Sequence, residues 1–277
     1  MMAESKKVLP CWIITLHPDG DGVQRLLENL SAQGIEAELF PGVDGRHAMP
    51  ALDADEFLDV QKSRLRHLCD MTNSEVGCYL SHLRAIKKAY ALGCEKLCLL
   101  EDDVEVEPEF GRALREINTF TEDFEFVRLM ALRVRKRKIV RDMLQGSHRL
   151  TRPERGVLGA QGYVVNRNAM AKIIQHASNI FEPIDKVYDH YWEFGLHQYC
   201  VEPHLLWERP HPSSILKSNV KRARVGFFYY LMRPFVKGLL SKKRNDYLTA
   251  YSGALYPAEL PSEKPGKTAR MKMPKVK

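Results

Sequence analysis

The chain opens with a short apolar run, an amphipathic segment and a second short run, and this order restricts the possible folds more than any other feature. Residues 8–16 form a largely apolar stretch that is typical of a buried strand. Residues 23–30 then carry valine and leucine at helical spacing, and Gly34 marks the end of that helix. Residues 36–40 indicate a second strand. This succession favours an α/β fold with a Rossmann-type, mainly parallel sheet flanked by helices.

The clearest single helix follows further along the chain. It begins at Thr72, which forms a capping box with Glu75, and it ends at Gly93. We expect the remaining elements to be a strand at residues 97–100, a helix after Pro108, strands at residues 124–130 and 162–165, a helix capped by Asn166 or Asn168, and a helix at residues 184–194.

Three consecutive carboxylates, Glu101, Asp102 and Asp103, follow the buried strand at residues 97–100. Ligands of α/β sheets bind at the carboxyl ends of strands, and carboxylate oxygens suit Mg²⁺ or Mn²⁺. Alternate side chains of an extended backbone share a face, so we predict Asp103 and Glu101 as metal ligands. We predict Glu101 and Asp102 as contacts to a nucleotide, with Asp102 also catalytic. The alternative is a solvated acidic loop, although adjacent like charges are costly without a cation.

The net charge of +7 is unevenly distributed. Residues 209–245 carry ten Lys or Arg and no acid, whereas residues 1–208 carry 26 Lys or Arg against 32 Asp or Glu. Within this basic extension, residues 221–232 couple cations to aromatic side chains, which is typical of a segment that lies on anionic lipid. A partner-protein interface or a nucleic-acid patch is the alternative. We therefore predict an α/β catalytic domain at residues 1–210, a membrane-associating segment at 211–256 and a disordered tail at 257–277.

Six cysteines are spread along the chain without a CxxC pair or a disulfide-like spacing. This usage favours free thiols and a reducing compartment. The N-terminus lacks the apolar stretch of a signal peptide, and no uninterrupted apolar run approaches the ~20 residues needed to span a bilayer. We expect a soluble or peripheral protein.

Two motifs in the first half of the chain resemble a known family. Residues 73–83 contain the pattern E-x-G-C-x-x-S-H on a helix, and residues 98–104 end a strand on E-D-D-V. This pair resembles glycosyltransferase family 25, which includes bacterial lipooligosaccharide galactosyltransferases and collagen galactosyltransferases. Shorter matches lie at residues 13–16, 43–46, 162–165 and 183–185, so that the resemblance covers about residues 8–210.

The resemblance implies a GT-A-like fold, an inverting reaction and a nucleotide-sugar donor, UDP-galactose or UDP-glucose. It places the donor-contacting arginine at Arg25, although the first loop lacks the Asn-Leu-Asp-Arg start of the family. Ser81, His82 and Gly162 complete the predicted donor contacts. His82 could reach the diphosphate or hold the acidic residues in place, and a purely structural histidine is the alternative.

A single displacement with inversion needs a general base beside the acceptor hydroxyl. Asp185 and Asp189 lie four residues apart on a predicted helix and so share a face, with Trp192 one turn further. We predict Asp185, ahead of Asp189, as this base. The alternative is a helix N-terminus that favours acidic side chains.

Two further basic features have open roles. A basic loop at residues 133–141 could close over a diphosphate or contact phosphorylated sugars, and a solvated loop is the alternative. His204 and His211 lie in proline-rich segments, where one of them could complete a metal shell.

These features together predict a hexosyltransferase with Mn²⁺ or Mg²⁺ as cofactor. UDP-galactose is favoured over UDP-glucose as donor, and the acceptor is a lipid-linked, lipooligosaccharide- or lipopolysaccharide-type glycan. The enzyme would lie in the cytoplasm, peripherally on the cytosolic face of the inner membrane.

Two alternatives remain at this point. A sugar nucleotidyltransferase would release pyrophosphate instead of a nucleoside diphosphate. A non-enzymatic RNA- or membrane-binding protein would rely on the basic extension, but the chain has no recognisable RNA motif, so we expect no nucleic-acid partner.

Overall fold

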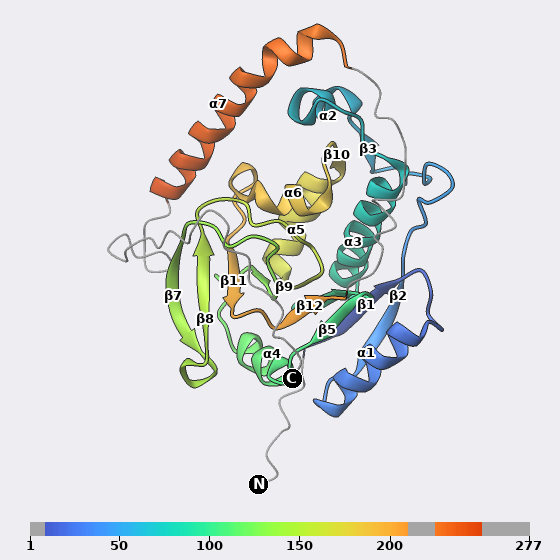
Figure 1. Ribbon diagram of the computed structural model, residues 1–277, viewed down its shortest axis with the longest axis vertical. Coiled ribbons are helices and arrows are strands. Elements are labelled where there is room, and N and C mark those ends of the chain that lie inside the picture. Colours follow the sequence, from blue (N-terminus) through green and yellow to red (C-terminus); the bar gives the residue numbers. More distant parts are fainter. Residues whose placement is uncertain (1–8, 210–224, 251–277) are drawn as a thin grey trace.

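The computed structural model describes residues 9–209 and 225–250, and its core is one twisted sheet of eight strands (Figure 1). The strand order is β2-β1-β4-β9-β6-β11-β8-β7. The bounds are β1 Cys11–Thr15, β2 Ala37–Pro41, β4 Lys96–Glu101, β6 Phe126–Arg128, β7 Arg137–Met143, β8 His148–Pro153, β9 Gly162–Asn166 and β11 Gln198–Glu202. Two small sheets pair β3 (Phe57–Leu58) with β10 (Asn179–Ile180), and β5 (Val104–Val106) with β12 (Leu206–Glu208).

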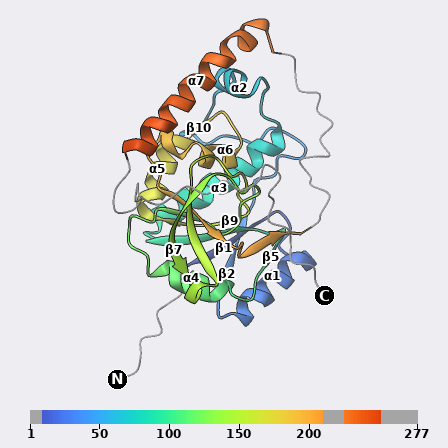
Figure 2. The same ribbon diagram turned by 60° about the vertical axis from the view of Figure 1, so that its left-hand side comes forward.

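The helices cover both faces of this sheet (Figures 1 and 2). Their bounds are α1 Asp21–Ala32, α2 Val60–His67, α3 Asn73–Ala91, α4 Phe110–Asn118, α5 Arg167–Ala177, α6 Ile184–Asp189 and α7 Phe227–Ala250, with 3-10 turns η1 at Leu144–Gly146 and η2 at Tyr191–Glu193. The predicted helix ends are confirmed where capping chemistry marks them. Thr72 and Glu75 form the capping box of α3, and the Asn166 side chain caps α5.

Most strands of the large sheet point the same way. β1 pairs in parallel with β2 and β4, and β6 pairs in parallel with β11, whereas β9 and β8 run against their neighbours. The predicted α/β class with a helix-flanked, mainly parallel sheet is therefore confirmed, with two reversed strands that the sequence pattern did not reveal. The reversal of β9 brings its first residue to the carboxyl ends of β4 and β6.

The alternation of side chains along each strand builds one core on each face of the sheet. Trp12 and Ile14 of β1 and Leu99 of β4 pack with the buried residues of α3 and α5. Ile13 and Leu100, one position away, pack with those of α1 and α4. Burial on both faces explains why these strands are continuously apolar in the sequence.

Two predicted elements differ from the structure. The helix expected at residues 184–194 ends at Asp189, because Tyr191 turns inward, where it is buried and its hydroxyl donates a hydrogen bond to the carbonyl oxygen of Pro153. The basic loop expected at 133–141 is a strand from Arg137 onward. The Arg137 guanidinium is buried against the carboxylate of Glu202, 2.8 Å away, and this pair holds the segment in the sheet.

The described part of the basic extension contains the long helix α7, which runs along the outside of the molecule beside α2 and η2 (Figures 1 and 2). Tyr247 anchors it: the side chain is buried, and its hydroxyl donates to the carbonyl oxygen of Leu196 at 3.0 Å. Within the described residues, no helix has the length and apolar character needed to cross a bilayer. The tail predicted at 257–277 lies outside the described residues, as do residues 210–224.

Candidate functional site

Four strand ends meet at one edge of the large sheet. β1 ends at Thr15, β4 at Glu101 and β6 at Arg128, and the antiparallel β9 begins there at Gly162. The chain leaves β4 through a two-residue turn, Asp102 and Asp103, before β5 begins. The three predicted carboxylates therefore lie at the carboxyl edge of the sheet, as expected from the sequence.

Asp102 is held in place from two directions. The Thr15 hydroxyl donates a hydrogen bond of 2.5 Å to its carboxylate, and the Thr15 oxygen in turn accepts from the backbone N–H of His17. Arg209 donates to the carbonyl oxygens of Asp102 and Gly22, at 2.7 and 2.9 Å. The turn after β4 and the loop after β1 are thus fixed to each other, which orients the Asp102 carboxylate.

Asp103 has the most perturbed environment at this edge. Burial, together with the neighbouring charges of Glu101, Glu208 and Asp102, raises the pKa of Asp103 to about 8. Its Oδ1 is buried and accepts no hydrogen bond from any described residue. A buried carboxylate oxygen without a donor is unfavourable, so the position calls for a cation.

Glu208 is a member of this group that sequence reasoning missed. It lies opposite Val104 in the β5–β12 pair, and burial together with the charge of Glu101 raises its pKa. No local pattern reveals it, since the pairing joins segments about one hundred positions apart. We refer to Glu101, Asp102, Asp103 and Glu208 together as the acidic edge.

His82 supports the acidic edge from within the core. Its Nε2 lies 3.1 Å from Glu101 Oε1, and its Nδ1 lies 3.0 Å from the Tyr163 hydroxyl. Since a carboxylate only accepts, Nε2 carries the proton and donates to Glu101. The Tyr163 hydroxyl is a further 2.9 Å from that of Tyr188 on α6. His82 is 1% exposed, which favours the second of its predicted functions, holding the acidic residues in place.

Cys78 lies beside this pair, and its sulfur, His82 and Glu101 offer ligand atoms within 4.8 Å of one another. Burial raises the pKa of the Cys78 thiol, and the charges of Glu101, Asp185 and Asp103 raise it further. The thiol therefore stays protonated, and the oxygen ligands are the better candidates for a cation. All six cysteines are free, as predicted.

Ser81 and Gly162 have structural tasks at this edge. The Ser81 hydroxyl donates to the Gly77 carbonyl oxygen and accepts from the Val43 backbone N–H, both at 2.8 Å, and so fastens the loop after β2 onto α3. A side chain at Gly162 would collide with Leu206. Their direct contacts to a donor stay predictions.

Arg25 is exposed on α1, and no hydrogen bond or ion pair ties it to the acidic edge within residues 9–209 and 225–250. The arginine that does contact the edge is Arg209, which also donates its backbone N–H to the Asp103 carbonyl oxygen at 2.7 Å. Sequence reasoning assigned Arg209 only to the basic extension. The donor contact of Arg25 stays a prediction.

The two predicted bases on α6 have different surroundings. The carboxylate of Asp189 is buried and accepts from Arg128 (3.0 Å) and from the backbone N–H groups of Val157 and Leu158. Asp185 is only partly buried, and its carboxylate accepts one long hydrogen bond, 3.4 Å, from Gly159. Asp185 thus keeps free acceptor capacity, and it shares the neighbourhood of Cys78 with the acidic edge.

His204 lies away from this group. It is buried, its Nε2 accepts from the backbone N–H of Ala131 at 3.4 Å, and burial lowers the pKa of His204 to about 4. It is a neutral core histidine beside Trp207. His211, the other predicted candidate for a metal shell, lies outside the described residues.

Comparison with known proteins agrees with the resemblance seen in the motifs. Residues 9–188 match the sequence model of a family described as "Glycosyltransferase family 25 (LPS biosynthesis protein)". A glycosyltransferase 25 family member of Aedes aegypti is 31% identical over 112 residues, which cover 38% of this chain and 18% of that protein. Human procollagen galactosyltransferase 2 is 30% identical over 112 residues, 38% of this chain and 17% of that protein. The match thus spans less than a fifth of the length of these relatives.

Among solved structures, a glycosyltransferase involved in glycosylating the major capsid of PBCV-1 aligns with 70% of this chain and 82% of its own. Its sequence identity is 12% and the TM-score is 0.36. The assignment therefore comes from the family match, which extends over more than half of the chain. The chain therefore belongs to glycosyltransferase family 25.

Proposed function

We propose that the protein transfers a hexose, galactose in preference to glucose, from a UDP-sugar to a lipopolysaccharide-type glycan, with inversion and with the help of a divalent cation. The observation that carries the proposal is the buried, unpartnered carboxylate oxygen of Asp103 within the acidic edge. The galactosyl donor follows the name of the human relative, and the acceptor class follows the description of the family.

The acidic edge fits a hard divalent cation. Its carboxylates have no lysine or arginine side chain as a counter-ion among the described residues, and the charge of each neighbour raises the pKa of Asp103. Asp103 and Glu101 would hold Mn²⁺ or Mg²⁺, with Glu208 adjacent. When bound, such an ion neutralises the negative charge that the leaving diphosphate develops.

The side chains around the acidic edge would divide the remaining tasks. Asp102, oriented by Thr15, accepts hydrogen bonds from the donor's ribose. His82 keeps the Glu101 carboxylate in one orientation. Asp185 takes the proton of the acceptor hydroxyl as the acceptor oxygen bonds to the anomeric carbon. The bond from that carbon to the diphosphate breaks, and UDP leaves with the bonding electrons.

The outer surface of α7 supports a membrane-bound acceptor. Phe227, Leu231, Phe235 and Leu239 follow one another at intervals of four residues and are 81%, 56%, 69% and 56% exposed. Such a stripe lies along one side of a helix. Arg233 and the neighbouring lysines of the same helix supply positive charge. Exposed aromatic and aliphatic side chains beside cations suit the interface of an anionic bilayer. We accordingly propose peripheral binding to the cytosolic face of the inner membrane.

Donor hydrolysis by the purified protein tests the proposal. UDP-galactose, UDP-glucose, GDP-mannose and CMP-sugars would be incubated with Mn²⁺, Mg²⁺ or EDTA, with and without lipooligosaccharide, and free nucleotide measured. We expect metal-dependent release of UDP that lipooligosaccharide accelerates. Release of pyrophosphate would instead indicate a nucleotidyltransferase, and no release under any condition would overturn the proposal.

A matched pair of variants localises the chemistry. Asp103→Asn should slow UDP release about a thousandfold. Asp142→Asn, at an exposed acid of β7 distant from the acidic edge in the sheet order, should leave it unchanged. Equal activity of both variants would remove Asp103 from the mechanism.

A further inference from the structure

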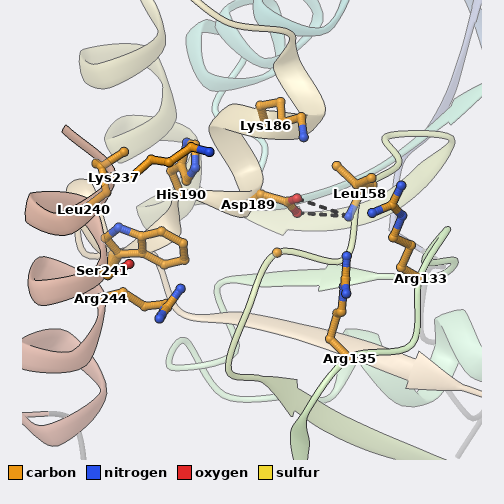
Figure 3. A pocket seen from close by; sticks show the side chains of 12 residues that line it. Arg133, Arg135, Leu158, Lys186, Asp189, His190, Lys237, Leu240, Ser241 and Arg244 are labelled. Atoms are coloured by element: carbon orange, nitrogen blue, oxygen red, sulfur yellow. Dashed lines mark hydrogen bonds between the residues drawn. The ribbon is translucent and has the colours of Figure 1, made fainter. Parts of the chain in front are cut away.

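A hollow of about 340 Å³ lies between α7 and the catalytic body (Figure 3). α6 and η2 form one wall, the segments at residues 133–135 and 156–158 form a second, and α7 closes the third side. Arg133 and Arg135 of the basic segment, which could contact a diphosphate or phosphorylated sugars according to the sequence, line this space, whereas the proposed catalytic residues Asp103 and Asp185 do not. We call it the basic cavity because of the side chains that line it.

Five permanent cations line the basic cavity: Arg133, Arg135, Lys186, Lys237 and Arg244. They come from three separate parts of the chain, the segment after β6, α6 and α7. In the structure as described, with residues 210–224 and the termini left aside, none of them forms an ion pair with a carboxylate. Unlike a run of charges on a solvated surface, these cations come from separate elements and face one common space.

The one carboxylate in the lining does not neutralise these cations. Asp189 is already engaged by Arg128 and by the backbone N–H groups of Val157 and Leu158, and Figure 3 shows its contact with Leu158. The basic cavity is left with a large excess of positive charge. In a partly enclosed space such an excess attracts an anion strongly, because water screens it less than at an open surface.

Trp192 supplies a second, independent indication of a ligand. Its ring borders the basic cavity, and the Arg244 guanidinium lies 5.7 Å from the ring centroid. Its Nε1 is buried and has no hydrogen-bond partner among the described residues. A buried indole N–H usually donates to a partner, and the indole ring itself can stack on the apolar face of a sugar.

We propose that the basic cavity binds a phosphate group carried by the glycan acceptor. The inference rests on the proposed function and adds the chemistry of the acceptor to it. Arginine guanidinium groups match the oxygens of a phosphate in pairs, which makes Arg133, Arg135 and Arg244 suitable partners.

The location assigns the phosphate to the acceptor instead of the donor. The donor's diphosphate belongs at the acidic edge, where the cation would neutralise it. The basic cavity borders α6, whose Lys186 and Asp189 line it, and Asp185 of the same helix is the proposed base. An acceptor held by its phosphate in the basic cavity would thus present a neighbouring hydroxyl to Asp185.

Calorimetric titration of the full-length protein with inorganic phosphate tests the site without any need for turnover. We expect saturable binding that weakens about tenfold in Arg135→Gln and in Arg244→Gln, as for the loss of a charge-assisted hydrogen bond. Arg112→Gln removes an exposed arginine of α4 and serves as the matched control. Equal affinity in all four proteins would overturn the site, whether or not the enzyme transfers hexose.

The source of the phosphate is tested with two acceptor preparations, lipooligosaccharide before and after removal of its phosphate by aqueous hydrogen fluoride. We expect dephosphorylation to raise the acceptor KM about tenfold, and Arg135→Gln to raise it similarly for the intact acceptor only. Inorganic phosphate should compete with the acceptor. Competition with the UDP-sugar, or equal KM values for both preparations, would reassign the cavity to the donor or to a lipid headgroup and overturn the proposal.

Discussion

The acidic edge and the basic cavity both border α6, and both gather like charges that the described part of the protein leaves without counter-ions. The acidic edge concentrates carboxylates around Asp103, whereas the basic cavity concentrates arginine and lysine side chains around Trp192. Charge clusters of one sign cost folding free energy unless a ligand of the opposite sign is bound. The difference in sign fits the two proposed ligands, a cation with the donor's diphosphate at the acidic edge and a phosphate of the acceptor in the basic cavity.

Removal of the central carboxylate should have the largest effect. We expect Asp103→Asn to lower kcat for UDP release about a thousandfold, because several kcal/mol of charge stabilisation are lost. The same change should leave the melting temperature equal or higher, since one buried like charge disappears. Steady-state kinetics and thermal unfolding measure both effects, and a variant that is inactive only because it unfolds would break the comparison.

The two acids of α6 should separate catalysis from stability. Asp185→Asn should lower kcat roughly a hundredfold or more, as for the loss of a general base, with little change in unfolding. Asp189→Asn leaves the buried Arg128 guanidinium without its counter-charge and should cost about 3 kcal/mol of unfolding free energy. Denaturant titration and steady-state kinetics of both variants measure these effects. If Asp189→Asn lost activity without losing stability, and Asp185→Asn lost stability instead, Asp189 would be the base.

Detachment of α7 should damage the basic cavity and spare the acidic edge. Tyr247→Ala removes the buried anchor of the helix and its hydrogen bond to Leu196. We expect the acceptor KM to rise about tenfold, since two of the five cations come from α7 and each charged hydrogen bond contributes on this scale. A larger rise in the KM of the UDP-sugar than in that of the acceptor would contradict the assignment of the donor to the acidic edge and the acceptor to the basic cavity.

The outer stripe of α7 should act on membrane binding alone. Phe235→Ser exposes less apolar surface to the bilayer, and its binding to phosphatidylglycerol vesicles should weaken roughly threefold to tenfold. Binding of inorganic phosphate should be unaffected because Phe235 does not line the basic cavity. Vesicle flotation measures the first effect. Unchanged flotation would contradict the proposed membrane surface.

Glu56 forms ion pairs with Arg84 and Lys87, in contrast to the unpaired charges of the acidic edge and the basic cavity. A substitution of Glu56 should have the smallest effect of those considered. Burial raises the pKa of Glu56, but hydrogen bonds from Arg84, the Asp53 backbone and Lys87 outweigh it and lower the pKa to about 2. A lowered pKa means that the carboxylate stabilises the fold above about pH 4.5 and loses this contribution as the pH falls toward 2. The stability difference between wild type and Glu56→Gln should therefore shrink over that range, and a difference that grows would show the sign to be wrong.

The two regions also differ in how far the sequence predicts them. Glu101, Asp102 and Asp103 are adjacent, and the apolar strand before them marks the edge of the sheet, so local pattern was enough to locate them. The sequence did not predict Glu208 and Arg209 as site residues, because the pairing of β12 with the distant β5 brings them to the acidic edge. For the basic cavity, the sequence suggested only the segment at residues 133–141 as a possible contact to phosphate groups, because the other walls depend on where α6 and α7 pack.

Within the fold, capped helices and buried strands were predictable, whereas long-range pairing was not. Thr72 and Glu75 marked α3 through hydrogen bonds between near neighbours. The reversed direction of β9 left no local signal. The end of α6 at Asp189 depends on the burial of Tyr191 against the distant Pro153, which no helical periodicity records.

The hydrogen-bonded line from Glu101 through His82 and Tyr163 to Tyr188 runs from a proposed metal ligand into the helix that carries the proposed base. Each member can reorient only if its neighbours adjust their protons in concert. A cation drawn to Glu101 would therefore set the donor and acceptor roles along the whole line and stiffen α6. In kinetic terms this predicts compulsory order, with nucleotide sugar binding first and acceptor second, and UDP leaving last.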